Sequence, residues 1–580
     1  MPERQLKWKS KQIREQIEVI EGKKSPSLLL KNARFLHAKL KQWVNGHIWI
    51  YQDRIVYVGN ELPSNLESTE VVDCQSYVLV PGYIEPHAHP FQLYNPQSLA
   101  RYASQTGTTT LINDNLMLFL LSGKKKAFSL LEELKQLPVS MYWWCRFDPQ
   151  TVLQEEDQVF NHHDIKSWLE HDLVLQGGEL TGWPRLLAGD DLMLLWLQEA
   201  KRLRKRIEGH FPGASETTLA KMMLFGADAD HEAMTGEDVW KRLMQGYTVS
   251  LRYSSIRPDL PKLLEEMKQY PIEDYSSIMF TTDGSTPIFY EQGLLDKMIA
   301  IAIEHGVDPM DAYLMASYNV ARYYGIDHWY GMIATGRIAH INFLESEELP
   351  TPVHVLAKGH WVKRNGAPCG EWPDLEWQNI GLKELSLDWE LSYDDLHFSM
   401  PFGIEMVNSV ITKPYSISLD ATGDELSMEH DESFLMLVDR HGKWHVNTLV
   451  KGFATSVSGF VSSYSNSGDL IILGKRKEDI LLAFNRMKEM GGGIVLAEHG
   501  KIVHEISLPL GGVMSDQRME EVIQQTKQLV KLLKERGYQH EDPIYNLLFF
   551  SSTHLPYIRV TPMGMYDVMK KTVLFPSIMR

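Results

Sequence analysis

Cysteine is scarce in this sequence, and its scarcity limits the kinds of site that the chain can build. The 580 residues include only 3 cysteines, against 22 histidines. The three, Cys74, Cys145 and Cys369, lie too far apart to form a disulfide framework or a paired CxxC zinc site. Any bound metal ion would therefore be held by histidine and carboxylate side chains.

Long apolar runs and an excess of positive charge are also missing. No run approaches the roughly 18–20 apolar residues that a membrane-spanning helix needs. With 58 basic and 75 acidic side chains the net charge is −17, which disfavours a protein that grips the nucleic-acid backbone. The first nine residues are charged and lack the apolar stretch of a secretory signal. We therefore expect no membrane partner, no nucleic-acid partner and a cytoplasmic location.

Changes of pattern along the chain predict six segments. Strand-rich stretches flank a long central region in which strand-like and helix-like runs alternate, and a mixed region follows. The predicted segments are an N-terminal extension, expected to be helical (1–26), the first part of a β-sandwich (27–80), an α/β barrel (81–335), the second part of the sandwich (336–372), a linker (373–390) and a C-terminal α/β domain (391–580).

The central region contains eight strand-like runs. They end near His89, Asn113, Cys145, Glu179, His210, His231, Arg252 and Asp283. These ends are about 28 residues apart on average, close to the roughly 30 residues of one βα unit. We therefore predict a (β/α)8 barrel of the TIM type, with its chemistry at the C-terminal ends of the strands. We expect further helices at 294–304 and 309–324, and core packing for Trp143 and Trp144.

Six polar residues stand at or near the predicted strand ends. They are His87, His89, Glu179, His210, His231 and Asp283. In an extended chain, residues i and i+2 point the same way, so His87 and His89 can reach one ion. Each of the others, taken alone, is better explained as a turn or helix-cap residue. Their joint placement on five strands of one barrel predicts that all six meet at its mouth.

Four histidines and two carboxylates are too many ligands for one tetrahedral ion. They suit two divalent ions with Glu179 as the bridge. Two ions would acidify a bridging water to hydroxide near neutral pH, and Asp283 could bind one ion and accept the proton. Glu232 and Asp230 adjoin His231 and are candidates to hold the second ring nitrogens of the histidines.

These residues lie in longer motifs that resemble the adenine deaminase branch of the amidohydrolase superfamily. Residues 81–89 (PGYIEPHAH) resemble its first-strand motif, and residues 107–110 (GTTT) its second. The segments around His210, His231 and Asp283 are similar to its fifth-, sixth- and eighth-strand motifs. Residues 508–516 and 558–561 resemble parts of the extra C-terminal domain that these deaminases carry. The resemblance therefore runs nearly end to end.

The resemblance implies both a fold and an activity. The fold would be an amidohydrolase-type barrel with a small β-sandwich domain and an adenine deaminase-type C-terminal domain. The activity would be the hydrolysis of adenine to hypoxanthine and ammonia, a step of purine salvage or breakdown, by attack of a metal-bound hydroxide on C6. Glu179 would bridge two ions, and Asp283 would relay the proton to the leaving amine. Manganese is the expected metal, with iron or zinc as alternatives.

Some polar positions depart from the family pattern. Residues 113–116 (NDNL) lack the histidine and glutamate of the family's DPHE, and residues 90–93 (PFQL) replace its usual Ile-Glu-Ser. Residues 463–469 lack both histidines of its AHDSHN run. The substrate, a small molecule, could thus be adenine, another purine or a cyclic amide. A non-catalytic relative that uses the barrel for binding is a third hypothesis. The substrate-binding residues stay open, and a homo-oligomer is one expectation.

Overall fold

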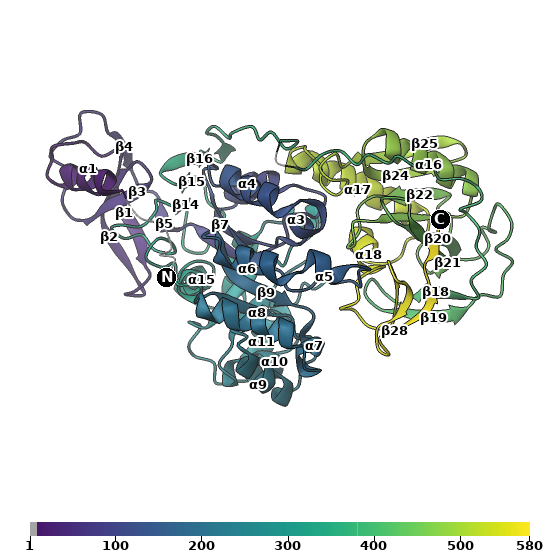
Figure 1. Cartoon of the computed structure of the whole chain (residues 1–580). Helices are drawn as coiled ribbons and strands as arrows, with labels where there is room; N and C mark the ends of the chain where they lie inside the picture. Colours follow the sequence, from purple (N-terminus) through teal and green to yellow (C-terminus); the bar gives the residue numbers. More distant parts are fainter. Residues whose placement is uncertain (1–8, 380) are drawn as a thin grey trace.

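The computed structural model describes residues 9–379 and 381–580. A sheet-rich part, the barrel and the C-terminal domain lie in a row from left to right in Figure 1. The predicted N-terminal extension contains helix α1 (Ser10–Ile20), whose buried Val19 packs on the first sheet; residues 1–8 of that extension lie outside the described residues. Within the described ranges, no helix has the length and apolar character needed to cross a membrane.

The strands before and after the barrel join in one nine-stranded sheet. Its strands before the barrel are β1 (Leu28–His37), β2 (Gln42–Tyr51), β3 (Arg54–Gly59), β4 (Glu70–Asp73) and β5 (Val78–Pro81), and those after it are β14 (Ile341–Leu344), β15 (His354–Ala357), β16 (His360–Arg364) and β17 (Ala367–Pro368). The order is β17-β16-β15-β14-β5-β1-β2-β3, and β4 pairs with β1. The two halves meet where β5 pairs antiparallel with β14, with Leu79 opposite Phe343. The two predicted sandwich segments therefore form one continuous sheet.

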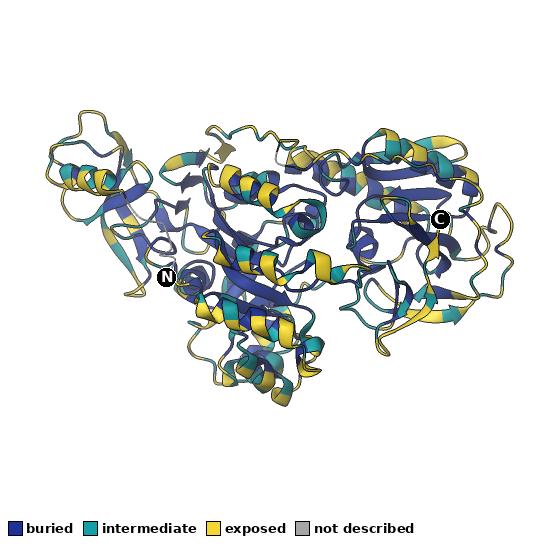
Figure 2. Ribbon diagram, in the orientation of Figure 1, coloured by how far each residue is buried: buried dark blue, intermediate teal, exposed yellow. Residues whose placement is uncertain are grey.

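Eight parallel strands form the barrel, and the predicted (β/α)8 fold is confirmed. They are β6 (Tyr83–Ala88), β7 (Thr108–Asn113), β8 (Ser140–Cys145), β9 (Val174–Leu180), β10 (Arg206–Gly209), β11 (Ala229–Asp230), β12 (Thr248–Arg252) and β13 (Ile278–Thr281). Each strand ends within two residues of its predicted position. The strands are buried while the covering helices expose their outer faces (Figure 2). This is the pattern of a parallel sheet that is covered by helices.

A buried carboxylate links the first and last strands of the barrel. Strands β6 and β13 are the two ends of the strand order. Oε1 of Glu85 accepts hydrogen bonds from Oγ1 of Thr281 at 2.7 Å and from the backbone N–H of His87 at 3.0 Å. Oε2 accepts from the backbone N–H of Thr282 at 3.0 Å. Glu85 therefore fixes the strand that carries His87 against the strand that leads to Asp283.

Helices surround the barrel. They are α2 (Pro96–Gln105), α3 (Leu116–Leu121), α4 (Lys124–Leu134), α5 (Glu156–Val159), α6 (His162–Glu170), α7 (Trp183–Leu187), α8 (Asp191–Arg202), α9 (Glu216–Phe225), α10 (Gly236–Met244), α11 (Leu260–Met267), α12 (Pro287–Tyr290) and α13 (Leu295–Glu304). Helix α8 illustrates why these segments are helical. The Asp190 side chain caps it by accepting from the backbone N–H of Met193. Its buried residues Met193, Trp196, Leu197 and Ala200 follow the i, i+3, i+4, i+7 spacing of one helix face.

The prediction of one helix over residues 309–324 is wrong. The segment forms two helices, α14 (Pro309–Met315) and α15 (Tyr318–Tyr324), because Ser317 leaves the helical conformation with φ −145° and ψ −81°. At the break, the carbonyl of Ala316 accepts a hydrogen bond from the backbone N–H of Ile84 at 2.8 Å. The barrel's first strand thus gains an acceptor that a continuous helix would have used itself.

The C-terminal domain has a second nine-stranded sheet, a three-stranded sheet and three helices. Its elements are β18 (Phe402–Met406), β19 (Thr412–Ser416), β20 (Glu432–Val438), β21 (Trp444–Lys451), β22 (Gly459–Ser462), β23 (Leu470–Gly474), α16 (Lys477–Glu489), β24 (Gly493–Glu498), β25 (Lys501–Ser507), α17 (Met519–Glu535), α18 (Pro543–Phe549), β26 (Ile558–Thr561), β27 (Gly564–Asp567), β28 (Thr572–Pro576) and β29 (Ile578–Met579). The large sheet runs β19-β18-β21-β20-β23-β22-β24-β25, with β29 beside β21, and β26-β27-β28 form the small one.

Barrel and C-terminal domain share one apolar core. Hydrogen bonds reinforce the contact: the Asn95 side-chain amide donates to the carbonyl of Ser515 at 2.8 Å, and the Tyr545 hydroxyl donates to the carbonyl of Gly284 at 2.8 Å. Gly284 directly follows Asp283, the residue predicted at the end of the eighth strand. The C-terminal domain therefore packs against the barrel end where the candidate site lies.

Candidate metal centre

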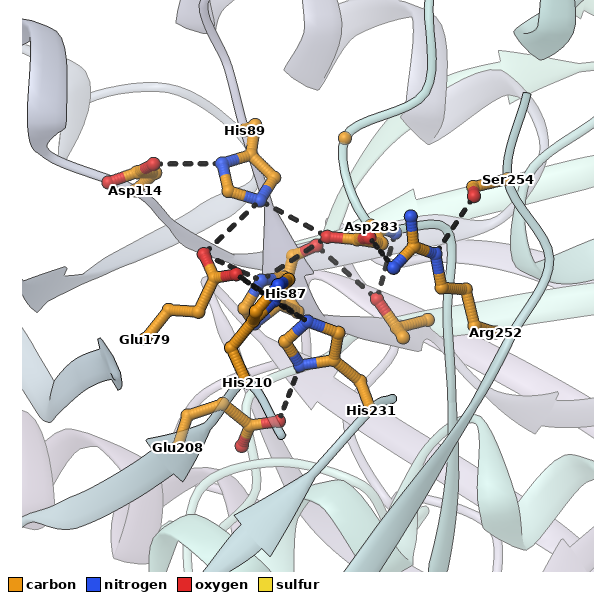
Figure 3. Close-up of polar contacts among 12 residues, drawn as sticks. His87, His89, Asp114, Glu179, Glu208, His210, His231, Arg252, Ser254 and Asp283 are labelled. Carbon is orange, nitrogen blue, oxygen red and sulfur yellow. Dashed lines mark hydrogen bonds and ion pairs between the residues drawn. The ribbon is translucent and has the colours of Figure 1, made fainter. Parts of the chain in front are cut away.

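The six residues predicted to bind metal meet at the C-terminal end of the barrel (Figure 3). In chain order they are His87 and His89 from the end of β6, Glu179 near the end of β9, and His210, His231 and Asp283, which follow β10, β11 and β13. Five strands thus contribute to one cluster. The barrel geometry, rather than proximity in the sequence, brings the side chains together.

Glu179 lies at the centre of this cluster. Its Oε1 is 2.7 Å from Nδ1 of His210 and 3.6 Å from Nε2 of His231. Its Oε2 is 3.6 Å from Nε2 of His87 and 3.8 Å from Nε2 of His89. The two carboxylate oxygens therefore face two different pairs of histidines, an arrangement suited to a carboxylate that bridges two ions.

Asp283 approaches the cluster from another side. Its Oδ1 is 3.4 Å from Nε2 of His87 and 3.2 Å from Nε2 of His89. Its Oδ2 is 2.7 Å from Nη1 of Arg252. One oxygen of Asp283 thus faces the metal-binding histidines, while the other is held by a guanidinium group.

Two glycines allow the backbone to present these carboxylates. Gly178 has φ +81° at a register shift between β9 and β10, and a Cβ there would lie 2.8 Å from the carbonyl oxygen of Glu208. Gly284 has φ +61°, and a Cβ there would lie 2.4 Å from Cβ of His89. Asp283 itself has φ +46°, a strained conformation that aspartate tolerates better than most residues. Only glycine fits beside each carboxylate.

Carboxylates also hold the far nitrogens of two histidines. Nδ1 of His89 is 2.8 Å from Oδ2 of Asp114, and Nδ1 of His231 is 3.2 Å from Oε1 of Glu208. Asp114 is ionised and can only accept, so Nδ1 of His89 carries the proton. In both histidines Nε2 is left to face the cluster. Trp144 stacks on the His87 ring with the ring centroids 4.4 Å apart, so this tryptophan packs directly against the site.

The two residues predicted to hold histidine nitrogens have different positions. Asp230 points away from the histidines: it accepts from the backbone N–H of Phe211 at 2.8 Å and pairs with Arg242. Successive residues of a strand point to opposite faces, so adjacency to His231 turns Asp230 away. Glu232 lies on the ligand side, with Oε1 3.5 Å from Nε2 of His231. Asp230 therefore does not hold a histidine nitrogen, and Glu232 lies near Nε2 of His231, the nitrogen that faces the cluster, rather than near the second ring nitrogen that was predicted.

Three arginines at the site were missed in the sequence. Nη2 of Arg146 is 2.8 Å from Oε2 of Glu179, and Nη1 of Arg252 is 2.5 Å from Oε1 of Glu232. Arg257 pairs with the other oxygen of Glu232. Arg146 directly follows β8 and Arg252 ends β12. The strand-end rule that selected the histidines would also have selected these two.

Three of the ligands have the protonation states of metal ligands. Burial opposes ionisation of Glu179 and Asp283, but Arg146, Arg252 and the histidines outweigh it and hold both pKa values well below the usual range. Burial and the neighbouring His231 lower the pKa of His87 to about 4. Two ionised carboxylates and a neutral imidazole are the protonation states in which these ligands bind metal.

The residues present fit divalent metal ions. Three groups place one ligand atom of each member within 4.8 Å of the others: His87, His89 and Glu179; His87, His231 and Asp283; Glu179, His210 and His231. Nε2 of His87 is buried and has no hydrogen-bond partner among the described residues. Buried polar atoms rarely lack a partner. A cation between these ligands would supply one.

A cavity of about 340 Å³ opens above the cluster. His89, Glu179, His210 and Asp283 line its floor, and residues of the C-terminal domain line the opposite side. This volume is within the usual range for small-molecule sites.

Comparisons with known proteins place this chain. Residues 78–364 match the model of the amidohydrolase family, and residues 409–572 match that of the adenine deaminase C-terminal domain. With the barrel and its ligand cluster, these matches define a hydrolase of carbon–nitrogen bonds from a superfamily that uses divalent metal ions. The chain is 59% identical to a protein of Halalkalibacterium halodurans and 56% identical to one of Bacillus subtilis, both provisionally named adenine deaminase, over 100% of each chain. It belongs to the adenine deaminase family.

A more distant relative agrees with this membership. Adenine deaminase 2 of Carboxydothermus hydrogenoformans is 27% identical over 572 residues, which cover 96% of this chain and 98% of that protein. The family predicted from the sequence motifs is therefore confirmed.

Proposed function

We propose that the protein hydrolyses adenine to hypoxanthine and ammonia at a pair of divalent metal ions. The observation that carries the proposal is the position of Glu179, whose two oxygens face two pairs of histidines beneath a cavity of the size of a small-molecule site. The metal of first choice is manganese, with iron or zinc as alternatives, since histidine and carboxylate ligands suit all three. A cytoplasmic location and a homo-oligomer remain predictions.

Histidines and carboxylates would share the two ions. His87, His89 and Asp283 would hold one ion. His210 and His231 would hold the other ion, and Glu179 would contact both. When bound, the ions supply the Lewis acidity that makes water a nucleophile near neutral pH.

Asp283 is the candidate for moving the proton. Its carboxylate is ionised, and its Oδ1 faces the histidines that would hold the ion, so it is placed to accept a proton from the attacking water. The water oxygen bonds to C6 of the base and the C6–N6 bond breaks. One proton of the water passes through Asp283 to the leaving ammonia, and the other ends on N1 as C6 becomes the carbonyl of hypoxanthine. Arg252 holds Oδ2 of Asp283, and Nε of Arg252 in turn donates to Oγ of Ser254 at 2.9 Å. This series of contacts keeps the carboxylate of Asp283 oriented throughout the reaction.

A second candidate is the same chemistry on another purine or on a cyclic amide. Two of the three departures from the family pattern contact each other: the hydroxyl of Tyr464 donates to the side-chain carbonyl of Gln92, which lines the cavity. The residues that differ from the family are thus partly gathered at the wall of this cavity. Side chains on the cavity wall that differ from those of the family favour a substrate other than adenine.

The deciding experiment measures ammonia release and metal content on the same sample. Metal-supplemented protein is incubated with adenine, with other aminopurines and with cyclic amides. We expect about two divalent ions per chain and turnover of adenine. Turnover of another compound, with none of adenine, would establish the second candidate. Less than one ion per chain without any turnover would support the non-catalytic hypothesis instead.

A further inference from the structure

The cavity wall that faces the metal cluster belongs to the C-terminal domain. Val410, Ile411, Tyr545, Phe549 and His554 lie on it. Most of this wall is apolar, so a base bound there would be enclosed by packing contacts. The few polar groups on the wall therefore decide which ring nitrogens can be recognised.

Two polar groups on this wall already have partners. The Tyr545 hydroxyl donates to the carbonyl of Gly284 at 2.8 Å, and Oγ of Ser552 donates to the carbonyl of Leu548 at 2.8 Å. Nδ1 of His554 differs, because it is buried and has no hydrogen-bond partner among the described residues. An unpaired buried nitrogen is costly unless something else pairs with it.

His554 also lies close to the reacting centre. Its ring is perpendicular to that of His210, with the centroids 5.5 Å apart. The same side chain lines a second cavity of about 570 Å³, which shares His210 and Gln150 with the first. His554 thus stands at the boundary between the space above the metal ligands and the larger space beyond.

The imidazole ring of His554 lines the cavity. A neutral imidazole offers one N–H donor and one lone pair. The edge of a purine ring offers matching acceptors and a matching N–H group, so one flat side chain can hydrogen-bond to it without introducing a charge.

We propose that His554 contacts the purine ring in the cavity and hydrogen-bonds to one of its ring nitrogens, and so helps to determine which base is accepted. The inference rests on the proposed function, since it concerns the substrate of that same site. The C-terminal domain then does more than cover the barrel: it supplies a group that recognises the base.

The test combines side-chain variants with analogues that each lack one ring nitrogen. The variants are His554→Phe, which keeps a flat ring without nitrogens, and His554→Asn and His554→Gln, whose amides approximate Nδ1 and Nε2. For each protein, kcat and KM are measured with adenine, and inhibition constants with 1-deaza-, 3-deaza- and 7-deazaadenine. His163→Phe is the control, because His163 is exposed on α6.

We expect wild type to bind one deaza analogue about tenfold more weakly than the other two, as for the loss of one hydrogen bond. In His554→Phe this difference should disappear, and either Asn or Gln should restore it. A merely structural role would weaken all three analogues alike. The same analogue profile in wild type and in folded, metal-loaded His554→Phe would overturn the inference. A wild-type protein that does not deaminate adenine would refute the proposed function instead.

Discussion

Glu179 illustrates how much the site depends on backbone that only glycine can provide. Its carboxylate enters the cluster because Gly178 adopts a positive φ at a register shift beside Glu208. Arg146 then keeps Glu179 ionised despite its burial. A side chain at residue 178 would displace the carbonyl of Glu208. The carboxylate of Glu208 would then move away from Nδ1 of His231, for which it is the hydrogen-bond acceptor. The ligand set therefore depends on a residue that binds nothing.

His87→Ala and Asp283→Asn should each abolish turnover with little effect on the fold. The first removes a ligand whose Nε2 is buried in the cluster, and the second removes the base that accepts the proton. We expect kcat to fall by about 1,000-fold or more in each case. Ammonia release, metal content and circular dichroism measure activity, ligand loss and folding separately.

The two variants should differ in metal content. His87→Ala should bind less metal than wild type, while Asp283→Asn retains a side-chain oxygen of the same shape and should retain more. Near-normal turnover in either variant would contradict the proposed site.

Sequence patterns identified the six clustered residues because strand ends and the His-x-His spacing are local features. They could not identify partners that the fold brings together from distant strands. Asp114 reaches His89, and Glu208 reaches His231, only after the barrel forms. Arg146 and Arg252 stand at strand ends as the histidines do, but arginine is not a metal ligand, and its role appears only when the fold places a carboxylate opposite it.

At the scale of elements, the loop before β23 carries a buried carboxyl group. Asp469 is 6% exposed, and its Oδ1 accepts from the backbone N–H of Arg440 at 3.3 Å. Burial raises the pKa of Asp469 to about 7, and the nearby Asp439 contributes to the rise. The loop is one of the segments that depart from the family pattern.

The raised pKa of Asp469 predicts a pH-dependent stability. In the unfolded chain this carboxyl loses its proton near pH 3.9, while in the fold it retains the proton until about pH 7. Between these values the folded state binds more protons, so stability falls as pH rises, by as much as about 1.4 kcal/mol per pH unit. Asp469→Asn should remove this part of the slope.

Urea unfolding of wild type and Asp469→Asn between pH 5 and pH 8 measures the effect. The free energies of unfolding should diverge in favour of the variant as pH rises, and the difference should level off above about pH 7. Parallel curves over this range would mean that Asp469 is not protonated in the fold.

The elements themselves were largely predictable, and the exception has a physical cause. Eight apolar runs with regular spacing predicted eight barrel strands, because each run must be buried in a parallel barrel. The interruption at Ser317 was not predictable, since residues 309–324 keep a helical apolar period. The break satisfies the backbone N–H of Ile84, which is more than two hundred residues earlier in the chain.

At the scale of the whole molecule, the barrel and the C-terminal domain should unfold together. They share one apolar core, and the C-terminal domain supplies part of the cavity wall. Across the interface, Oγ1 of Thr286 donates to Oδ2 of Asp542 at 2.8 Å. Asp542 caps α18, the helix that carries Tyr545 and Phe549 into the cavity. One contact thus ties the barrel to the position of that helix.

Thr286→Val should destabilise the whole chain rather than the C-terminal domain alone. The substitution keeps the shape of the side chain but leaves a buried carboxylate oxygen without its donor, at a cost of about 1–3 kcal/mol. We expect a single urea-unfolding transition at lower urea concentration, and a higher KM because α18 is less firmly placed. Thr335→Val, at an exposed position, is the matched control. Two separate transitions, or equal stability of the two variants, would show that the domains fold independently and that this contact does not join them.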